Sequence, residues 1–405
     1  MRHQLEREAK FVLPDGATLP ALDVSPHLRV SATRLSATCW DTLDLRLLTV
    51  GHTLRHRSSS DGTEVGWTLK LAPGAGDAER SGGAGLMIRR EIHVDGTPDL
   101  VPDTILALVR GVTRGEVLAP VATIVTDRRR VLLADPDGKP LVEIADDAVS
   151  ATPAGSTETG FREIEVEQLD DDGAPLVGQV IDRLKEAGAR REHRNKLQVV
   201  LGTEPSPAHP RKVATVGELV RESIARGTKQ LISNDPHVRL GDDPAAVHRA
   251  RVATRRLRSD LRSLRHVLDR DRVDRLRGEL AWLGQLLGGV RDLDVLRAGL
   301  LTGDEQDPTT AHGITEILAA IDRDRRSRQS ELVDALDCPR YLTLLAGLAA
   351  AADSPPFADG IDIDERADEL AADIVRAAWR STARAAKRLG PHPSSAELHD
   401  VRRRI

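Results

Sequence analysis

Charged residues that alternate along the chain constrain the fold of the N-terminal half more than any other feature. The first such stretch is residues 6–10, where Glu6, Glu8 and Lys10 are separated by single residues. On a β-strand, residues two apart leave the same face, so these three side chains are expected to share one face. Two carboxylates and an ammonium make a poor core. They suit a site for a metal ion and an anion, because hard cations such as Mg2+ prefer carboxylate oxygens.

The same alternation recurs downstream, with basic pairs in some segments and acidic pairs in others. The members of the pattern are Arg55 and Arg57, Thr68 and Lys70, Arg89 and Glu91, Arg128 and Arg130, Glu143 and Asp147, and Glu163, Glu165 and Glu167. A sheet with one solvated face accounts for any single segment. A closed antiparallel barrel with a polar interior accounts for all of them, because charged residues then point inward and apolar residues point outward under flanking helices. The basic strands are expected to hold a polyanion and the acidic strands a metal.

These segments resemble the motifs of the CYTH domain, the fold of the triphosphate tunnel metalloenzymes. Glu6-x-Glu8-x-Lys10 looks like the N-terminal signature of that family, and the later segments match in order. Lys196 matches the late lysine of the family, although Asn195 stands where family members often carry Ser. The resemblance covers the first half of the chain. It implies an eight-stranded antiparallel tunnel that binds a linear triphosphate through inward Arg and Lys and a divalent metal through inward Glu and Asp.

The resemblance also implies roles for individual residues. The residues expected to be catalytic are Glu6, Glu8 and Lys10. The residues expected to bind phosphate are Arg55, Arg57, Lys70, Arg89, Arg128, Arg130 and Lys196. The expected ligands of Mg2+ or Mn2+ are Glu6, Glu8, Glu143, Asp147, Glu163 and Glu165. Such a metal would neutralise phosphate oxygens and lower the pKa of the attacking water.

A proline-rich segment over residues 203–214 separates two regions with different patterns. It lacks periodicity, as a linker should. Thr215 and Glu218 then have the spacing of a capping box and are expected to open a helix. We therefore expect a tunnel domain over 1–202, a linker over 203–214 and an all-α helical bundle over 215–405. The fold class is α+β.

The C-terminal region carries a basic stripe beside an apolar stripe. Helices are expected over residues 216–232, 244–268, 271–301, 310–337, 340–352, 365–389 and 395–405. The apolar positions of the second helix recur at spacings of three and four and are Ala250, Ala253, Leu257, Leu261, Leu264 and Leu268. The adjacent basic face carries His248, Arg251, Arg255, Arg258, Arg262 and Arg265. A solvated face, or one paired with carboxylates of other helices, would account for a single helix of this kind.

A second histidine–arginine pair favours a more specific interpretation. His399 and Arg402 repeat the spacing of His248 and Arg251, which indicates an internal duplication with both helices lining one groove. Both segments resemble motifs of the CHAD domain, a conserved-histidine α-helical domain that binds polyphosphate and often follows a CYTH domain. The resemblance implies that polyphosphate is bound by His248, Arg251, Arg255, Arg258, Arg262, His399 and Arg402. Because the sequence stops at Ile405, inside the second motif, we expect the bundle to be C-terminally incomplete.

Composition narrows the remaining functional classes. No apolar run is long enough to cross a membrane, and the charged N-terminus lacks the pattern of a signal peptide, so a cytoplasmic protein is expected. Cys39 and Cys338 fall in different predicted domains and are not expected to pair. The segment 82–85 is rich in glycine but lacks the lysine of a phosphate-binding loop. Eight aromatic residues (Trp 4, Phe 3, Tyr 1) are too few for base stacking, so nucleic acid is not an expected partner.

These features predict a metal-dependent hydrolase of inorganic triphosphate or short polyphosphate, joined to a domain that binds polyphosphate. Two alternatives stay open. The tunnel of a non-catalytic polyphosphate-binding or targeting protein would only grip the end of the chain. A class IV-like adenylyl cyclase or a thiamine triphosphatase would use the same tunnel on a different triphosphate. The sequence ranks neither these substrates nor the oligomeric states.

Overall fold

The computed structural model describes five stretches of the chain. They are residues 1–21, 27–73, 85–204, 213–301 and 308–402. Three expectations from the sequence fall at least partly outside them: the glycine-rich loop at 82–84, the centre of the linker at 205–212, and the last residues of the second histidine motif at 403–405.

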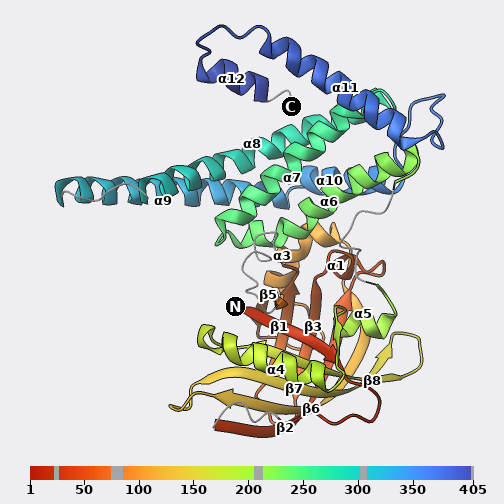
Figure 1. Ribbon diagram of the computed structural model, residues 1–405, viewed down its shortest axis with the longest axis vertical. Coiled ribbons are helices and arrows are strands. Elements are labelled where there is room, and N and C mark those ends of the chain that lie inside the picture. Colours follow the sequence, from red (N-terminus) through yellow and green to blue (C-terminus); the bar gives the residue numbers. More distant parts are fainter. Residues whose placement is uncertain (22–26, 74–84, 205–212, 302–307, 403–405) are drawn as a thin grey trace. The chain divides into compact units, whose positions relative to one another are not determined.

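The chain forms two compact units (Figure 1). The first contains residues 1–206 together with residues 232–249, and the second contains residues 207–231 and 250–405. The strands all belong to the first unit, and the second is built from helices. The predicted α+β class is confirmed.

Eight antiparallel strands close into a barrel in the first unit. They are β1 (Arg2–Val12), β2 (His27–Asp41), β3 (Thr53–Ser59), β4 (Val65–Leu71), β5 (Met87–Val94), β6 (Ala119–Ala134), β7 (Pro140–Pro153) and β8 (Thr159–Gln168). Their order around the barrel is β5-β4-β3-β2-β6-β7-β8-β1, and pairing of β1 with β5 closes it. A short ninth strand, β9 (Arg190–Glu192), pairs with the end of β1. The predicted eight-stranded antiparallel barrel is confirmed.

The second half of strand β1, from Glu6 to Phe11, is largely buried on both faces, and each face has a different chemistry. Glu6, Glu8 and Lys10 are buried, and so are Ala9 and Phe11 on the opposite parity. The apolar face of β1 joins a core with residues of β7 and β8 and with the inner face of the helix α4 (Ala174–Glu186). The period-2 alternation therefore separates an apolar outer layer, covered by a helix, from a charged interior.

Shorter helices complete the first unit. They are α1 (Arg46–Thr49), α3 (Asp103–Thr113), the 3-10 turn η1 (Asp171–Gly173) and α5 (Lys196–Leu201). A reciprocal capping box starts α5: the Asn195 side chain accepts from the Gln198 N–H at 2.9 Å, and the Gln198 side chain accepts from the Asn195 N–H at 3.0 Å. The cap fixes Lys196 as the first residue of the helix. Gly202 ends α5 with φ 63°, a conformation that suits glycine.

In the described part of the chain, seven helices follow the linker. They are α6 (Val216–Leu240), α7 (Pro244–Ser263), α8 (Arg270–Leu301), α9 (Pro308–Asp337), α10 (Pro339–Asp353), α11 (Ala367–Ala386) and α12 (Ser395–Arg402). Each expected helix is present, and all six predicted apolar positions of the α7 region are buried. No helix in the described part of the chain is long and apolar enough to cross a membrane.

The ends of α6 and α7 differ most from the sequence predictions. Helix α6 continues to Leu240, past the expected end at residue 232, although Pro236 lies inside it. Its last turns are buried in the first unit, where Asp235 packs so closely on α3 that a Cβ at Gly111 would lie 2.5 Å from its carboxylate. This packing offsets the roughly 3 kcal/mol cost of an internal proline.

Helix α7 ends at Ser263, before the expected end at residue 268. Leu268 instead forms a β-bridge with Phe357, and the Asp269 N–H donates to the Pro356 carbonyl at 2.8 Å. The apolar periodicity continues past the helix because the residues after it are also buried. Periodicity alone therefore could not show where the helix stops.

Candidate functional site

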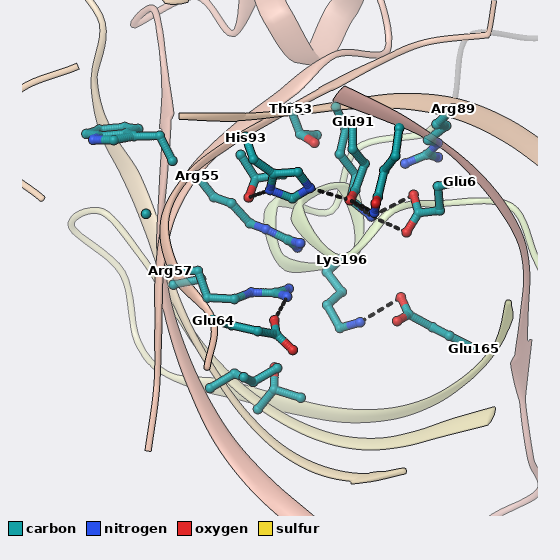
Figure 2. A pocket seen from close by; sticks show the side chains of 18 of the residues that line it. Glu6, Thr53, Arg55, Arg57, Glu64, Arg89, Glu91, His93, Glu165 and Lys196 are labelled. Atoms are coloured by element: carbon teal, nitrogen blue, oxygen red, sulfur yellow. Dashed lines mark hydrogen bonds and ion pairs between the residues drawn. The ribbon is translucent and has the colours of Figure 1, made fainter. Parts of the chain in front are cut away.

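The barrel encloses a cavity of about 450 Å3 (Figure 2). Side chains from all eight barrel strands and from the N-terminus of α5 line it. The basic residues that line the cavity and were predicted to bind phosphate are Arg55, Arg57, Lys70, Arg89, Arg128, Arg130 and Lys196. The structure thus brings this whole set to one cavity, while their binding of phosphate stays a prediction.

Three of the predicted metal ligands form a tight acidic cluster. Oxygens of Asp147, Glu163 and Glu165 all lie within 4.8 Å of one another. Asp147 and Glu163 face each other across the β7–β8 pair, and Glu165 is two residues along β8. Two lysines neutralise the cluster: Lys196 Nζ lies 2.9 Å from Asp147 and 2.8 Å from Glu165, and Lys10 Nζ lies 3.4 Å from Glu163.

The donor set fits a hard divalent cation. Glu163 Oε2 and Glu8 Oε1 are buried and accept no hydrogen bond from the described residues. An unpartnered buried carboxylate oxygen is costly, and a metal ion would satisfy it. Glu8 lies near the cluster, because Lys10 Nζ is 3.8 Å from its other oxygen. Asp147, Glu163 and Glu165, with Glu8 beside them, are therefore the residues that could hold Mg2+ or Mn2+.

The other two predicted metal ligands lie in ion pairs with predicted phosphate-binding residues. Lys70 Nζ contacts the Glu6 carboxylate at 2.7 and 2.8 Å and that of Glu91 at 2.7 Å. Arg130 holds Glu143 with two hydrogen bonds of 3.1 and 2.6 Å. Arg130 compensates Glu143, whereas Lys70 is shared by two carboxylates, and the role of Glu6 and Glu143 as ligands stays a prediction.

Glu165 and Lys10 stabilise each other's charged forms. Burial raises the pKa of Glu165, but Lys10, Lys196 and Arg128 outweigh it and hold this pKa well below its usual range. Burial likewise lowers the pKa of Lys10, but the carboxylates of Glu163, Glu165 and Glu8 outweigh it and raise this pKa. Glu165 is therefore ionised at neutral pH, as a metal ligand must be.

The opposite wall of the cavity carries arginines with unused donors. Arg55 Nε and Arg57 Nε are buried and donate to no described residue. Arg55 makes no ion pair within the described chain, and Arg57 Nη1 donates to Glu64 at 2.6 Å. Burial and the neighbouring Arg55 lower the pKa of Arg57 to about 10, which still leaves it charged at neutral pH. Positive charge that lacks a full complement of partners is a site for an anion.

Three further cavity residues were not assigned a role from the sequence. Glu64 lies in the turn between β3 and β4, where no alternation could reveal it. His93 shares the parity of Arg89 and Glu91 on β5, so the pattern did contain a signal for it. Glu167 closes the acidic run of β8; burial and the charge of Glu6 raise its pKa to about 8.

The predicted polyphosphate stripe of α7 lies on the surface. His248, Arg251, Arg255, Arg258 and Arg262 are all exposed. Arg251 lies 3.4 Å from Asp292 of α8. By contrast, Arg255, Arg258 and Arg262 make no ion pair with any residue in the described part of the chain.

The second histidine motif lies on α12, which packs against α11. His399 and Arg402 are both exposed there. The expectation that α7 and α12 line one groove stays a prediction.

Comparison with sequence families and known proteins matches both halves of the chain. The CHAD domain family matches residues 222–405. An uncharacterised protein of Mycobacterium tuberculosis strain CDC 1551 / Oshkosh is 30% identical over 434 residues, which cover 100% of this chain and 80% of that protein. An uncharacterised protein of M. tuberculosis strain H37Rv matches with the same identity and coverage.

Solved structures resemble one half or the other. The CHAD domain of the plant Ricinus communis is 24% identical, with a TM-score of 0.39, and the match covers 49% of this chain and 67% of that one. A candidate adenylyl cyclase from Hippeastrum, described as having a dominant triphosphatase activity, is 17% identical with a TM-score of 0.30. That match covers 51% of this chain and 100% of the Hippeastrum chain.

Proposed function

We propose that the barrel hydrolyses inorganic triphosphate or the end of a short polyphosphate chain, with Mg2+ or Mn2+ as cofactor. The chain belongs to the proteins in which a CYTH-type tunnel is joined to a CHAD domain, and this membership supports the proposal. We propose in addition that the helical domain binds polyphosphate. The two activities would act on the same kind of linear polyanion.

One observation carries the proposal for the barrel. Glu165 of the acidic cluster lines the same cavity as Arg55 and Arg57, and the cluster and the arginines each keep buried polar atoms without a hydrogen-bond partner among the described residues. A metal ion would complete the first group, and phosphate oxygens would complete the second. A linear triphosphate with its metal ion supplies both at once, whereas a simple anion would satisfy only the arginines.

The residues of the barrel have distinct tasks in this reaction. Arg55 and Arg57 would hold phosphate oxygens in a fixed orientation, which is the main contribution of a protein to phosphoryl transfer. Lys10 and Lys196 hold the carboxylates of the cluster in place through their ion pairs. The metal, when bound, would neutralise phosphate oxygens and make the attacking water more acidic.

The lining favours an inorganic substrate over a nucleotide. Trp67, the one large aromatic side chain in the described lining, is 1% exposed. Its ring makes edge contacts with Trp40 and His56, and its N–H donates to the Thr97 carbonyl at 3.0 Å. It therefore offers no face on which an adenine or thiamine ring could stack. This supports triphosphate hydrolysis over adenylyl cyclase or thiamine triphosphatase activity.

The helical half supports binding rather than chemistry. Arg255, Arg258 and Arg262 lie on one exposed side of α7 without ion pairs. A flexible polyanion can contact them in sequence, and its binding would keep the chain end near the tunnel at a raised local concentration.

A substrate panel on the full chain tests the proposal. Inorganic triphosphate, ATP and thiamine triphosphate are each incubated with Mg2+ or Mn2+, and released phosphate and cyclic AMP are measured. We expect phosphate from triphosphate, no cyclic AMP, and no release after chelation. Binding of triphosphate without release, measured by calorimetry, would support the non-catalytic alternative instead.

A further inference from the structure

Three polar side chains on two adjacent strands form a hydrogen-bonded chain that reaches into the barrel cavity. His93 Nε2 lies 3.1 Å from Glu91 Oε2, and His93 Nδ1 lies 3.3 Å from the Thr68 hydroxyl. The β4–β5 register places Thr68 opposite His93, and Glu91 is two residues along the same face of β5. Figure 2 shows the imidazole beside Glu91, pointing into the cavity.

The partners of Glu91 fix the tautomer of the imidazole. Lys70 Nζ lies 2.7 Å from the Glu91 carboxylate. Burial raises the pKa of Glu91, but Lys70 and the hydrogen bond from His93 outweigh it, so the carboxylate is ionised. An ionised carboxylate only accepts hydrogen bonds, so Nε2 of His93 must carry the hydrogen. In the neutral ring, Nδ1 is then the acceptor.

The His93 side chain lines the cavity and is partly exposed. The His93 side chain is 34% exposed, whereas that of Glu91 is 8% exposed. The contact with Thr68 is long for a hydrogen bond from a hydroxyl, so a water molecule in the cavity can replace it at Nδ1. A base oriented by a buried carboxylate and open to water has the arrangement that general-base catalysis requires.

We propose that His93 accepts the proton of the water that attacks the terminal phosphorus, and that Glu91 is the positioning residue that orients its ring. This inference rests on the proposed triphosphate hydrolysis and assigns a step within it. Nothing in the alternating pattern of arginines and carboxylates supplies a neutral base, whereas an imidazole changes charge near neutral pH.

Charged groups surround the imidazole on each element packed against it. Glu91 lies on its own strand, Lys70 on β4, and Arg55 on β3, from where it acts electrostatically on Glu91. Arg2 of β1 is the residue paired with His93 across the β1–β5 ladder. Lys70, Arg55 and Arg2 are the cations among these groups. A phosphate group that they attract would lie next to the accepting nitrogen.

The step balances in atoms and charge. The oxygen of water forms a bond to the terminal phosphorus. The bond from that phosphorus to the bridging oxygen breaks, and its electron pair stays on the diphosphate. The proton of the water moves to His93 Nδ1, and the imidazolium later returns it to solvent. The products are orthophosphate and diphosphate.

The test is the variant His93→Gln in the full chain, because glutamine can still donate to Glu91 but cannot act as a base. We expect kcat to fall by about a hundredfold or more, while the Kd for triphosphate, measured by calorimetry, changes by less than about threefold. His266→Gln, at an exposed histidine outside the barrel, serves as the control and should retain wild-type kinetics.

The possible outcomes distinguish a failure of the inference from a failure of the proposed function. An active wild type with an equally active His93→Gln variant overturns the inference and leaves the proposed function intact. A wild type that binds triphosphate but releases no phosphate overturns the proposed function and the inference with it. If His93→Gln does not fold, His93→Asn replaces it, because it also lacks a base, and a wild-type kcat in that variant contradicts the inference.

Discussion

The barrel interior and the exposed face of α7 both gather arginines, but the two regions differ in how far these arginines are buried and paired. Arg128, 10% exposed, holds Asp147 with two hydrogen bonds of 2.7 and 2.6 Å and also contacts Glu165 at 2.6 Å. Arg255 and Arg258 on α7 are exposed and lack ion pairs within the described chain. Burying a charge is costly unless it is paired, whereas an exposed charge is already solvated.

This difference separates two modes of recognition. Buried, oriented charges select one geometry and are little affected by salt, which suits a reaction site. Exposed charges on a helix bind any flexible polyanion and depend strongly on ionic strength, which suits a tether. Arginine thus contributes specificity in the barrel and affinity on α7.

The largest expected effect comes from the acidic cluster. Glu163→Gln removes one ligand charge from the cluster while keeping the size of the side chain. We expect kcat for triphosphate to fall by about a hundredfold or more, because metal binding weakens. Phosphate release and calorimetric titration with Mn2+ measure the two effects. Glu186→Gln, on the exposed side of α4, is the matched control and should change neither.

The second-largest effect is expected for polyphosphate binding by α7. Reversing Arg255 and Arg258 to Glu should weaken the binding of polyphosphate by the full chain by about tenfold or more. The slope of log affinity against log salt should become shallower by roughly 1.4, since each phosphate contact on a single-stranded polyanion contributes about 0.7. Hydrolysis of triphosphate should stay at the wild-type rate, which would separate the two regions.

A control for α7 uses exposed arginines that already have partners. Arg328 pairs with Glu331 and Arg376 with Asp373, both at 2.9 Å. Reversing these two residues should affect polyphosphate binding much less. Equal losses from both double variants would mean that net charge alone attracts the ligand, and the proposed α7 stripe would have no special role.

A smaller effect is expected at Glu64. Its carboxylate accepts from Arg57 at 2.6 Å and lies 4.0 Å from Arg130, so it competes with phosphate for both. Glu64→Gln should tighten triphosphate binding by about threefold to tenfold, which is the effect of removing one nearby like charge. Calorimetry without metal measures it. Weaker binding in the variant would show that Glu64 orients Arg57 rather than competing for it.

The smallest effect concerns the pH dependence of stability. Burial and Glu6 raise the pKa of Glu167 to about 8 from 4.5, so the folded state keeps a proton that the unfolded state loses. The contribution of Glu167 to stability is therefore complete below about pH 4.5 and declines as the pH rises toward 8. Compared with the wild type, Glu167→Gln should gain stability in urea between pH 5 and 8. A constant difference between the two proteins would contradict the raised pKa.

The period of the charged residues was enough to predict the barrel and much of its lining. Glu6 and Lys10 could be placed on the inside because a strand allows only two faces, and the apolar parity had to go to the other. The partners within the cavity could not be predicted, because cross-strand register joins residues far apart in sequence. The contact of Thr68 with His93 depends on that register alone.

Features outside the regular strands could not be predicted from the alternation of charged residues either. Glu64 lies in a turn and reaches Arg57 only because the β3–β4 hairpin folds it back. The late end of α6 and the early end of α7 follow from tertiary contacts of Asp235 and Leu268, which override local propensity.

The most direct test of the account is kcat for inorganic triphosphate in the full chain with saturating Mg2+ or Mn2+, measured at low and high salt. The account predicts steady release of orthophosphate that changes by less than about threefold between 50 and 500 mM salt, since the reacting charges are buried. It also predicts that release is lost in Glu163→Gln. A wild type that binds triphosphate without hydrolysing it, or a Glu163→Gln variant with the wild-type rate, would contradict it.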